Sequence, residues 1–315
     1  MKNLYIASCD ENGGIYRYAM DGGISPIDRT ELKNPMYMTA YDNKMYVLLR
    51  ETFADGTSGM LSFDIAADGS LKNPSETVST EGKVACHIYA GASGVYAANY
   101  VSGSVIKFGG KCDVHEGHGI NPNRQEKAHT HFVCPAPDGK YICVTDLGLD
   151  TVFFYDTDLN IVSKAKVPDG CGARHLIFSA DGKYMYCANE LISSVSVFKY
   201  ADGKAELLHT YPALPKDYTG ENTAAAIRLC GNRLYVSNRG ADNVAVFEVS
   251  GENLKLRNYI KVGAHPRDME VSDGILISTD MNDDKVTFYN AETGEKLDYE
   301  ISGIKSPLCV LINDC

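Results

Sequence analysis

The sequence predicts an all-β protein, a β-propeller of seven blades with four antiparallel strands in each blade. Three observations support this prediction. A small polar residue paired with an aromatic residue recurs every 42 to 49 residues, which is the spacing of four-stranded blades rather than of helical repeats. Apolar and polar residues alternate around each pair, as they do in half-buried strands. The two ends of the chain also carry complementary parts of one further blade.

Five units of the repeat are visible between about residues 82 and 290. In each unit a small polar residue ends one strand, and an aromatic residue lies in the next strand nine residues later. The pairs are Asn99/Phe108, Asp146/Tyr155, Asn189/Phe198, Asn238/Phe247 and Asp280/Tyr289. Successive pairs are 47, 43, 49 and 42 residues apart.

The strands of each unit are predicted from their alternating residues and their turns. Segments such as SVSVFKY are rich in Val, Phe and Tyr with a period of two, which favours antiparallel strands. An earlier strand in each unit ends in a tight turn, as in FVCPAPDGKY, LIFSADGKY and IRLCGNRL. The Asp-Gly and Gly-Asn pairs favour hairpins because both residue types accept a positive φ.

The two remaining blades lie at the ends of the chain. A sixth unit, MYMTAYDNKMYVLLRE followed by GMLSFDIAADG, contains the insertion TFADGTS where the other units have a short turn. The chain opens with LYIASCDENGGIYRY, which lacks a first strand, and ends with SPLCVLIND, which is a first strand alone. Pairing residues near 306–312 with residues near 3–18 would close the ring and remove its open edges. We therefore expect a single domain, residues 1–315.

Composition excludes several classes of partner. The net charge is −11 and the pI is near 5.2, whereas binding to the phosphate backbone of a nucleic acid needs a basic surface. No apolar run is long enough to span a membrane, and the N-terminal residues lead directly into the first strand without a signal peptide. We expect a protein that binds neither nucleic acid nor membrane.

The ten cysteines predict buried thiols rather than a disulfide framework. Five of them fall within apolar strands, and no C-x-x-C motif occurs. A chain of this length also has no need of disulfides to stabilise its core. Free, reduced cysteines and a cytoplasmic location are the expectation. The five are Cys134, Cys143, Cys187, Cys230 and Cys309.

Candidate site residues gather where first strands begin and second strands end, because in a propeller blade these two points share one face of the disc. His87, His131, Arg174 with His175, and Arg267 stand at the starts of first strands. Glu190 and Arg239 directly follow the ends of second strands. Clustered cations on an acidic protein suggest an anionic ligand focused into a cleft. Such residues also serve structural roles, and the Asn or Asp that ends each second strand most simply satisfies turn backbone groups.

The loop CDVHEGHGINPNRQEKAHTHF holds four of the eight histidines. Three interpretations stay open for it. A zinc site is one, although no spacing in the loop repeats a zinc signature. A polar loop that crosses between blades is another. In the third, the loop is a lid from which Arg124 and His129 reach the mouth of the central channel. The four histidines are His115, His118, His129 and His131.

At these residues the chain resembles the seven-bladed lactonase family, which includes propeller-type 6-phosphogluconolactonases and carboxy-cis,cis-muconate cyclases. The resemblance covers the whole chain. It is most specific in ACHIYAGASGVYAANYVSGSV, in HEGHGINPNRQEKAHTHFVCPAPDGKYICVTDLGLDTV, in GARHLIFSADGKYMYCANELISSVSVF and in HPRDMEV. Two segments depart from the family pattern: AHTH replaces a proline-rich PHPH-like stretch, and the strand start TAAAI carries no charge.

The resemblance implies an active site and a substrate class. Positions matching the family's proposed catalytic residues are His131 in HTHF, Arg174 in GARH, Glu190 in ANEL and Arg239 in SNRG. Glu190 or His131 would activate a water molecule, and an arginine would stabilise the oxyanion of a lactone carbonyl. The expected substrate-binding residues are Arg267, His87, His129, Arg124 and His175.

The implied reaction is hydrolysis of a small anionic sugar lactone, with 6-phosphogluconolactone as the expected substrate. No cofactor is expected, because nucleotide-binding and nucleophilic-serine motifs do not occur in the sequence, and no metal is expected, because no spacing repeats a zinc signature. Two alternatives are lactone formation from a muconate and a non-catalytic propeller that binds a ligand or protein. We expect a monomer or a weak homodimer.

Overall fold

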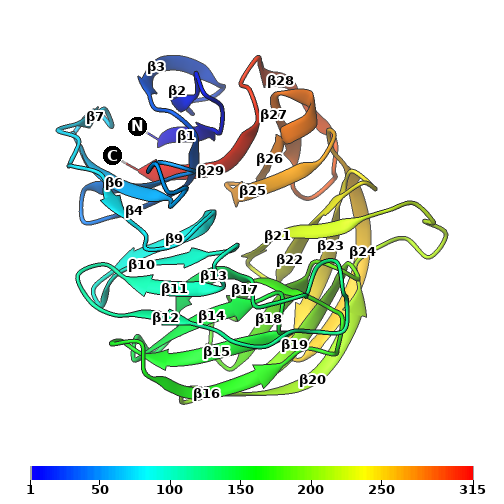
Figure 1. The fold of residues 1–315 in the computed structure, drawn as a ribbon. Coiled ribbons are helices and arrows are strands. Elements are labelled where there is room, and N and C mark those ends of the chain that lie inside the picture. Colours follow the sequence, from blue (N-terminus) through cyan, green and yellow to red (C-terminus); the bar gives the residue numbers. More distant parts are fainter. Residues whose placement is uncertain (1, 315) are drawn as a thin grey trace.

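The structure is a computed structural model that describes residues 2–314. Its strands form seven antiparallel sheets, which follow one another around a ring in chain order (Figure 1). First strands of neighbouring sheets contact each other, as β9 does with β4 and β13, so these strands line the centre of the ring. The predicted all-β propeller with seven blades is confirmed.

Five sheets each consist of four consecutive strands. The first two are β9 (Ala85–Gly91), β10 (Gly94–Asn99), β11 (Ser104–Lys107) and β12 (Cys112–Val114), then β13 (Thr130–Pro135), β14 (Tyr141–Asp146), β15 (Thr151–Asp156) and β16 (Ile161–Lys166). The next two are β17 (Ala173–Phe178), β18 (Tyr184–Asn189), β19 (Ser194–Ala201) and β20 (Lys204–Pro212), then β21 (Thr223–Cys230), β22 (Arg233–Arg239), β23 (Asn243–Ser250) and β24 (Asn253–Lys261). The fifth is β25 (Pro266–Ser272), β26 (Ile275–Asp280), β27 (Lys285–Asn290) and β28 (Lys296–Ser302), with the 3-10 turn η1 (Met281–Asp283) inside it.

The sixth sheet carries the insertion that the sequence indicates. Its strands are β4 (Pro35–Tyr41), β5 (Lys44–Leu49), β6 (Gly59–Ile65), β7 (Leu71–Lys72) and β8 (Val78–Ser79). The short strands β7 and β8 both pair with β6, so together they replace one outer strand. Residues 52–58 join β5 to β6 in a loop that is closed by hydrogen bonds from the Thr52 and Phe53 amides to the Thr57 carbonyl, at 2.9 and 3.1 Å.

The seventh sheet combines the two ends of the chain. Its order is β29 (Pro307–Asp314), β1 (Lys2–Ser8), β2 (Gly14–Ala19) and β3 (Ser25–Glu31). Strand β29 runs antiparallel to β1 in a register that pairs Asn3 with Asn313 and Ile6 with Val310. The predicted closure of the ring is therefore confirmed. Figure 1 shows the two ends side by side, with β29 on the inner side of β1.

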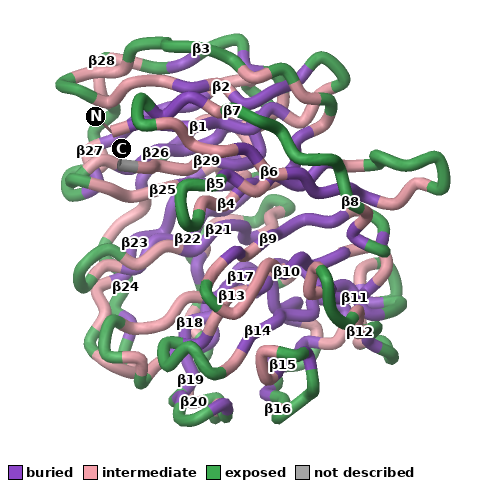
Figure 2. The backbone as a smooth tube through the Cα atoms, turned by 90° about the vertical axis from the view of Figure 1, so that its left-hand side faces the viewer, coloured by how far each residue is buried: buried purple, intermediate pink, exposed green. Residues whose placement is uncertain are grey.

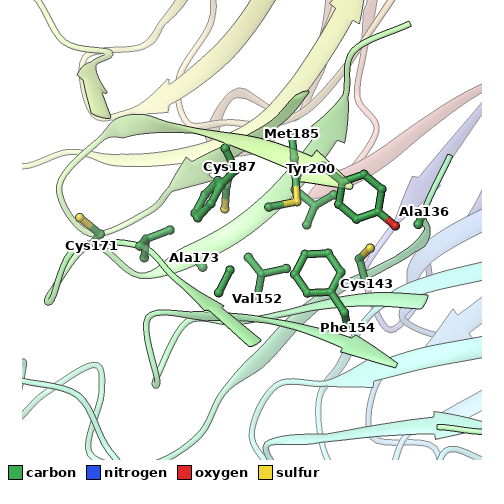
Figure 3. Close-up of a cluster of buried hydrophobic side chains, with 13 residues drawn as sticks. Ala136, Cys143, Val152, Phe154, Cys171, Ala173, Met185, Cys187 and Tyr200 are labelled. Atoms are coloured by element: carbon green, nitrogen blue, oxygen red, sulfur yellow. The ribbon is translucent and has the colours of Figure 1, made fainter. Parts of the chain in front are cut away.

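The core lies between the sheets. Inner and middle strands are mostly buried, whereas the outermost strands β3, β16 and β28 are mostly exposed or half-buried (Figure 2). Figure 3 shows one contact between neighbouring blades, where Val152 and Phe154 of β15 pack near Met185 and Cys187 of β18. Cys143, Cys171 and Cys187 therefore serve as small apolar side chains in this core. The expectation of a buried thiol is wrong for Cys230, which lies exposed at the end of β21. The nine cysteines within residues 2–314 form no disulfide.

A β-bulge recurs in the first strand of every blade. At each bulge the pairing register with the second strand shifts, which leaves an inner-strand residue without a one-to-one partner. These residues are Leu308, Met36, Cys86, His131, Arg174, Ala225 with Ala226, and Arg267. Because a bulge re-aims the side chain at that point, the repeated irregularity directs one residue from each blade towards the central channel.

Candidate active site

A cavity of about 430 Å³ opens at one mouth of the central channel. This is the size of a small-molecule site. Its acidic, basic and histidine lining residues are Arg50, Arg124, His131, Glu190, Arg239, His265 and Arg267, and the others are Met36, Val84, Cys86, Tyr100 and Thr223. Within that lining, four guanidinium groups therefore face a single carboxylate.

Glu190 is the centre of this arrangement. It directly follows β18, its backbone N–H donates to the Gly172 carbonyl at 2.8 Å, and its side chain is only 4% exposed. Carboxylate Oε2 lies 3.0 Å from Arg174 Nε and 3.0 Å from Arg239 Nη2, while Oε1 accepts a 2.5 Å hydrogen bond from Arg124 Nη2. Three arginines from different parts of the chain thus hold one buried carboxylate.

The charges of this group control its protonation. Burial alone would raise the pKa of the Glu190 carboxyl, but the Arg239 and Arg174 guanidiniums outweigh burial and hold that pKa well below the usual value. Burial, reinforced by Arg239 and Arg267, lowers the pKa of Arg174 to about 9. At neutral pH the Glu190 carboxylate is therefore ionised and Arg174 remains charged.

His131 lies beside the carboxylate without bonding to it. Its Nε2 is 4.0 Å from Glu190 Oε2, and its Nδ1 is buried without a hydrogen-bond partner among the described residues. Burial and the neighbouring Arg174 lower the pKa of His131 well below 6.5, so the imidazole is neutral. A neutral imidazole next to an ionised carboxylate can accept or relay a proton.

Arg239 is fixed by backbone oxygens as well as by Glu190. Its Nη2 donates to the Ala224 carbonyl at 2.9 Å, and its Nε lies 3.5 Å from the Thr223 carbonyl. Ala224 is itself tied to Glu190, since its N–H donates to the Glu190 carbonyl at 3.1 Å. The edge of the neighbouring blade therefore positions one guanidinium at the cavity wall.

Arg124 reaches the cavity from a long crossing loop, residues 115–129, that connects two blades. One carboxylate, Asp146, holds both ends of this loop: its Oδ2 contacts His115 Nδ1 at 2.6 Å, and its Oδ1 accepts from the His129 amide at 2.8 Å. His115 Nε2 also contacts the Tyr155 hydroxyl at 2.6 Å. The loop is therefore fixed at its base, and it places Arg124 against Glu190 and within 3.3 Å of the Tyr100 hydroxyl.

The four histidines of the loop region do not converge on one point. His115 bonds Asp146, His118 contacts the Gly119 carbonyl, and His129 stacks on Tyr100 with ring centroids 4.5 Å apart. Within residues 2–314, no cluster of three or more His, Cys, Asp or Glu side chains is arranged to hold a metal ion.

Of the expected site residues, Glu190, His131, Arg239, Arg124 and Arg267 line the cavity. The other four expected residues do not line this cavity: His87, His129, His175 and Arg174. Arg174 lies below the cavity and supports Glu190 from there. His129 is held in the crossing loop, with its ring 3.0 Å from the Tyr100 carbonyl and 3.1 Å from Glu126.

His87 and His175 lie deeper in the channel. Their ring centroids are 5.5 Å apart, and that of His175 is 5.3 Å from that of His131. Both ring nitrogens of His175 are buried without a partner within residues 2–314. His175 lines a second cavity of about 10 Å³ beneath the first, which is room for about one water molecule. His175 is therefore placed to contact that space rather than a substrate in the main cavity, and His87 is not among the lining residues of either cavity.

Sequence reasoning missed Arg50, Tyr100 and His265 as cavity residues. Arg50 and Tyr100 each directly follow the end of a second strand, which is the position that Glu190 occupies in its own blade. Tyr100 is preceded by Asn99, one of the polar residues that mark the repeat, whereas Arg50 is preceded by the apolar Leu49. The repeat therefore indicates the position of Tyr100 but carries no such signal for Arg50.

The structure is thus a closed propeller with an arginine-rich cavity around one buried carboxylate. The family model of the lactonases with a seven-bladed β-propeller matches residues 3–312. The chain belongs to this lactonase family.

The chain is also similar to a bacterial protein of known sequence and to two solved structures. An uncharacterised protein from Staphylococcus aureus is 32% identical over 328 residues, with 94% of this chain and 95% of the relative covered. A Bacteroides fragilis structure proposed to be a 6-phosphogluconolactonase superposes with a TM-score of 0.88 at 26% identity, covering 99% of this chain and 98% of that one. A periplasmic gluconolactonase from Pseudomonas aeruginosa gives a TM-score of 0.86 at 25% identity, with coverage of 99% and 98%.

Proposed function

We propose that this protein hydrolyses a sugar lactone, with 6-phosphogluconolactone as the substrate and 6-phosphogluconate as the product. The observation that carries the proposal is the ionised Glu190 carboxylate, held by arginines at the wall of an otherwise cationic cavity. Membership of the lactonase family supports the reaction class. The likeness to structures described as gluconolactonases supports a gluconolactone as substrate.

The reaction needs a nucleophilic water and a stabilised oxyanion. A water beside Glu190 attacks the lactone carbonyl carbon, its proton passes to Glu190, and the carbonyl oxygen becomes an oxyanion held by Arg239 or Arg124. The tetrahedral intermediate then collapses, the ring C–O bond breaks, and the ring oxygen leaves with the proton that Glu190 returns directly or through His131. The products are a carboxylic acid, which ionises at neutral pH, and a free hydroxyl.

In the protein without substrate, the arginine contacts make Glu190 a weak base, because they hold its pKa well below the usual value. Substrate changes that balance. When Arg239 or Arg124 turns part of its hydrogen bonding to the developing oxyanion, its attraction for the carboxylate falls and the pKa of Glu190 rises. The proton affinity of Glu190 would then increase in the transition state, in which Glu190 takes the proton from water.

The depressed pKa of Glu190 predicts an unusual pH profile. A base works only when deprotonated, and a lowered pKa keeps Glu190 deprotonated at lower pH. For gluconolactone, which carries no titrating phosphate, we expect kcat/KM, corrected for spontaneous hydrolysis, to stay level as the pH falls from 7 to about 5 and to decline only below the ordinary glutamate value of 4.5. Initial rates measured in buffers of constant ionic strength would check this. An acidic limb centred near pH 6.5 would assign the base to a histidine of ordinary pKa instead.

The proposed reaction is tested by following loss of 6-phosphogluconolactone above its spontaneous rate. We expect saturable hydrolysis whose rate is proportional to protein concentration. Gluconolactone and a muconate substrate serve as comparisons. Turnover of the muconate alone would show the cyclase reaction. Binding of 6-phosphogluconate without hydrolysis of any lactone would show a propeller that binds its ligand without catalysis.

A further inference from the structure

The cavity arginines divide into two sets by what they contact. Arg124, Arg174 and Arg239 all contact Glu190. Arg50 and Arg267 line the same cavity, but within residues 2–314 neither guanidinium makes a hydrogen bond or ion pair. The Nε of Arg50 is also buried without any partner. Two positive charges in this cavity therefore have no directly bonded acidic partner in the part of the chain that the structure describes.

Arg50 and Arg267 come from blades that are close together in the ring. Arg50 follows β5 in the sheet of β4–β8, and Arg267 is the bulge residue of β25. One sheet, β29-β1-β2-β3, lies between those two blades. Glu190 follows β18, three blades away from Arg50 and two from Arg267. The unpaired guanidiniums therefore line a part of the cavity wall that is separate from the blade carrying the carboxylate.

Arg50 and Arg267 are close enough to affect each other electrostatically. Burial, then Arg239, lowers the pKa of Arg267 to about 10, and Arg50 contributes to the same shift. Like charges held together in a half-buried cavity repel each other, and each loses hydration. An arrangement of this kind is stabilised when an anion enters between the guanidiniums.

The chemistry of the pair favours a phosphate group over a carboxylate. A guanidinium donates two parallel hydrogen bonds to a phosphate, and a doubly charged phosphate has oxygens enough for two such partners. A carboxylate offers fewer oxygens and only a single charge. His265 lines the cavity as well, and burial lowers its pKa to about 4, so the neutral ring can donate one hydrogen bond without adding charge.

We propose that Arg50 and Arg267, with His265 beside them, form a phosphate subsite that holds the phosphorylated end of the substrate while the lactone carbonyl lies at Glu190. The role of the subsite in catalysis rests on the proposed lactonase function. Its affinity for phosphate does not, because the guanidiniums recognise the anion whether or not a lactone is attached.

Calorimetric titration with inorganic phosphate, 6-phosphogluconate and gluconate tests the subsite. The proteins compared are the unmodified chain, Arg50→Gln, Arg267→Gln and the control Arg257→Gln, whose exposed arginine pairs with Glu248 at 3.0 Å outside the cavity. We expect each cavity variant to bind 6-phosphogluconate about 10- to 100-fold more weakly, as for the loss of a charged hydrogen-bonding partner. Gluconate affinity should change less than about twofold, and Arg257→Gln should behave like the unmodified protein.

Kinetics separate the subsite from the proposed reaction. In Arg50→Gln and Arg267→Gln we expect KM for 6-phosphogluconolactone to rise about tenfold or more, and KM for gluconolactone to change little. Hydrolysis of both lactones with no loss in either variant would overturn the subsite and leave the reaction standing. Arginine-dependent binding of 6-phosphogluconate with no hydrolysis would leave the subsite standing and overturn the reaction.

Thermal unfolding shows whether each variant is folded. Removing an unpaired charge from a half-buried position should leave Tm unchanged or raise it when no ligand is present. Phosphate should raise Tm of the unmodified protein and of Arg257→Gln, by linkage of binding to folding, but not of the cavity variants. An equal phosphate shift in all four proteins would place the anion elsewhere and overturn the proposal. If Arg267→Gln does not fold, Arg50→Gln decides the question.

Discussion

Replacement of Glu190 by glutamine is expected to lower kcat for lactone hydrolysis by about 100-fold or more, with KM little changed. Glutamine keeps the shape of the side chain and some of its hydrogen bonds, but it cannot take a proton from water, and a positioned general base contributes about 10²- to 10⁴-fold. Steady-state rates with 6-phosphogluconolactone would give both constants.

The same substitution should also reduce stability, because Glu190 neutralises Arg174, whose side chain is only 2% exposed. Removal of one partner from a buried ion pair costs about 3–5 kcal/mol. Rates should therefore be measured well below the Tm of the variant. Glu248→Gln is the matched control, since that carboxylate is exposed and pairs with Arg257 on the surface. It should retain both the activity and the Tm of the unmodified protein.

Two results would redirect the mechanism. Full activity in Glu190→Gln would remove Glu190 as the base and make His131 the candidate, to be tested by His131→Asn. Loss of activity on chelation, with recovery when metal is restored, would require a metal-bound water in place of the carboxylate-activated one.

Most of the fold could be predicted from the sequence because a propeller blade is a local structure. The strand ends, hairpin turns and aromatic positions of a blade lie within about 45 residues of each other. The same sequence pattern therefore recurs once in each blade and can be recognised in the sequence. Closure of the ring followed from two incomplete ends, even though β1 and β29 are almost a whole chain apart. The outer strand of the sixth sheet was harder to foresee, because β7 and β8 are two residues each and share one partner.

The site was only partly predictable, and the reason is geometric. His131, Arg174 and Arg267 stand at strand starts, where repeated bulges aim them at the channel, and the repeat revealed them. Two features that decide the chemistry could not be predicted from the repeat. The partners of Glu190 include Arg124, whose place depends on a crossing loop fixed by Asp146. The depth of Arg174 below the cavity depends on packing of all the blades together.

Deletion of residues 306–315 is expected to abolish cooperative folding rather than to weaken it slightly. Strand β29 supplies the innermost strand of its sheet and contacts both neighbouring first strands, β25 and β4. Its Leu308, Cys309 and Val310 are buried, and the Val310 amide donates to Asp268 Oδ2 at 3.2 Å. Each buried apolar side chain contributes about 1.5–3 kcal/mol, and a whole protein has a net stability of only about 5–15 kcal/mol.

The deletion also exposes the length of β1 as an unpaired edge, which favours aggregation. We expect the truncated protein to be largely insoluble, and its soluble fraction to show no sharp thermal transition by circular dichroism. The control is a circular permutant in which residues 306–314 precede residue 2 through a short linker. Because β29 and β1 are antiparallel, with Asn313 beside Asn3, a hairpin connection suffices. The permutant should regain a cooperative transition and lactone hydrolysis, since it restores the strand without restoring its position in the chain. A truncated protein that melts cooperatively near the Tm of the full chain would show that six blades and an open edge are enough, and that pairing of the two ends does not hold the ring closed.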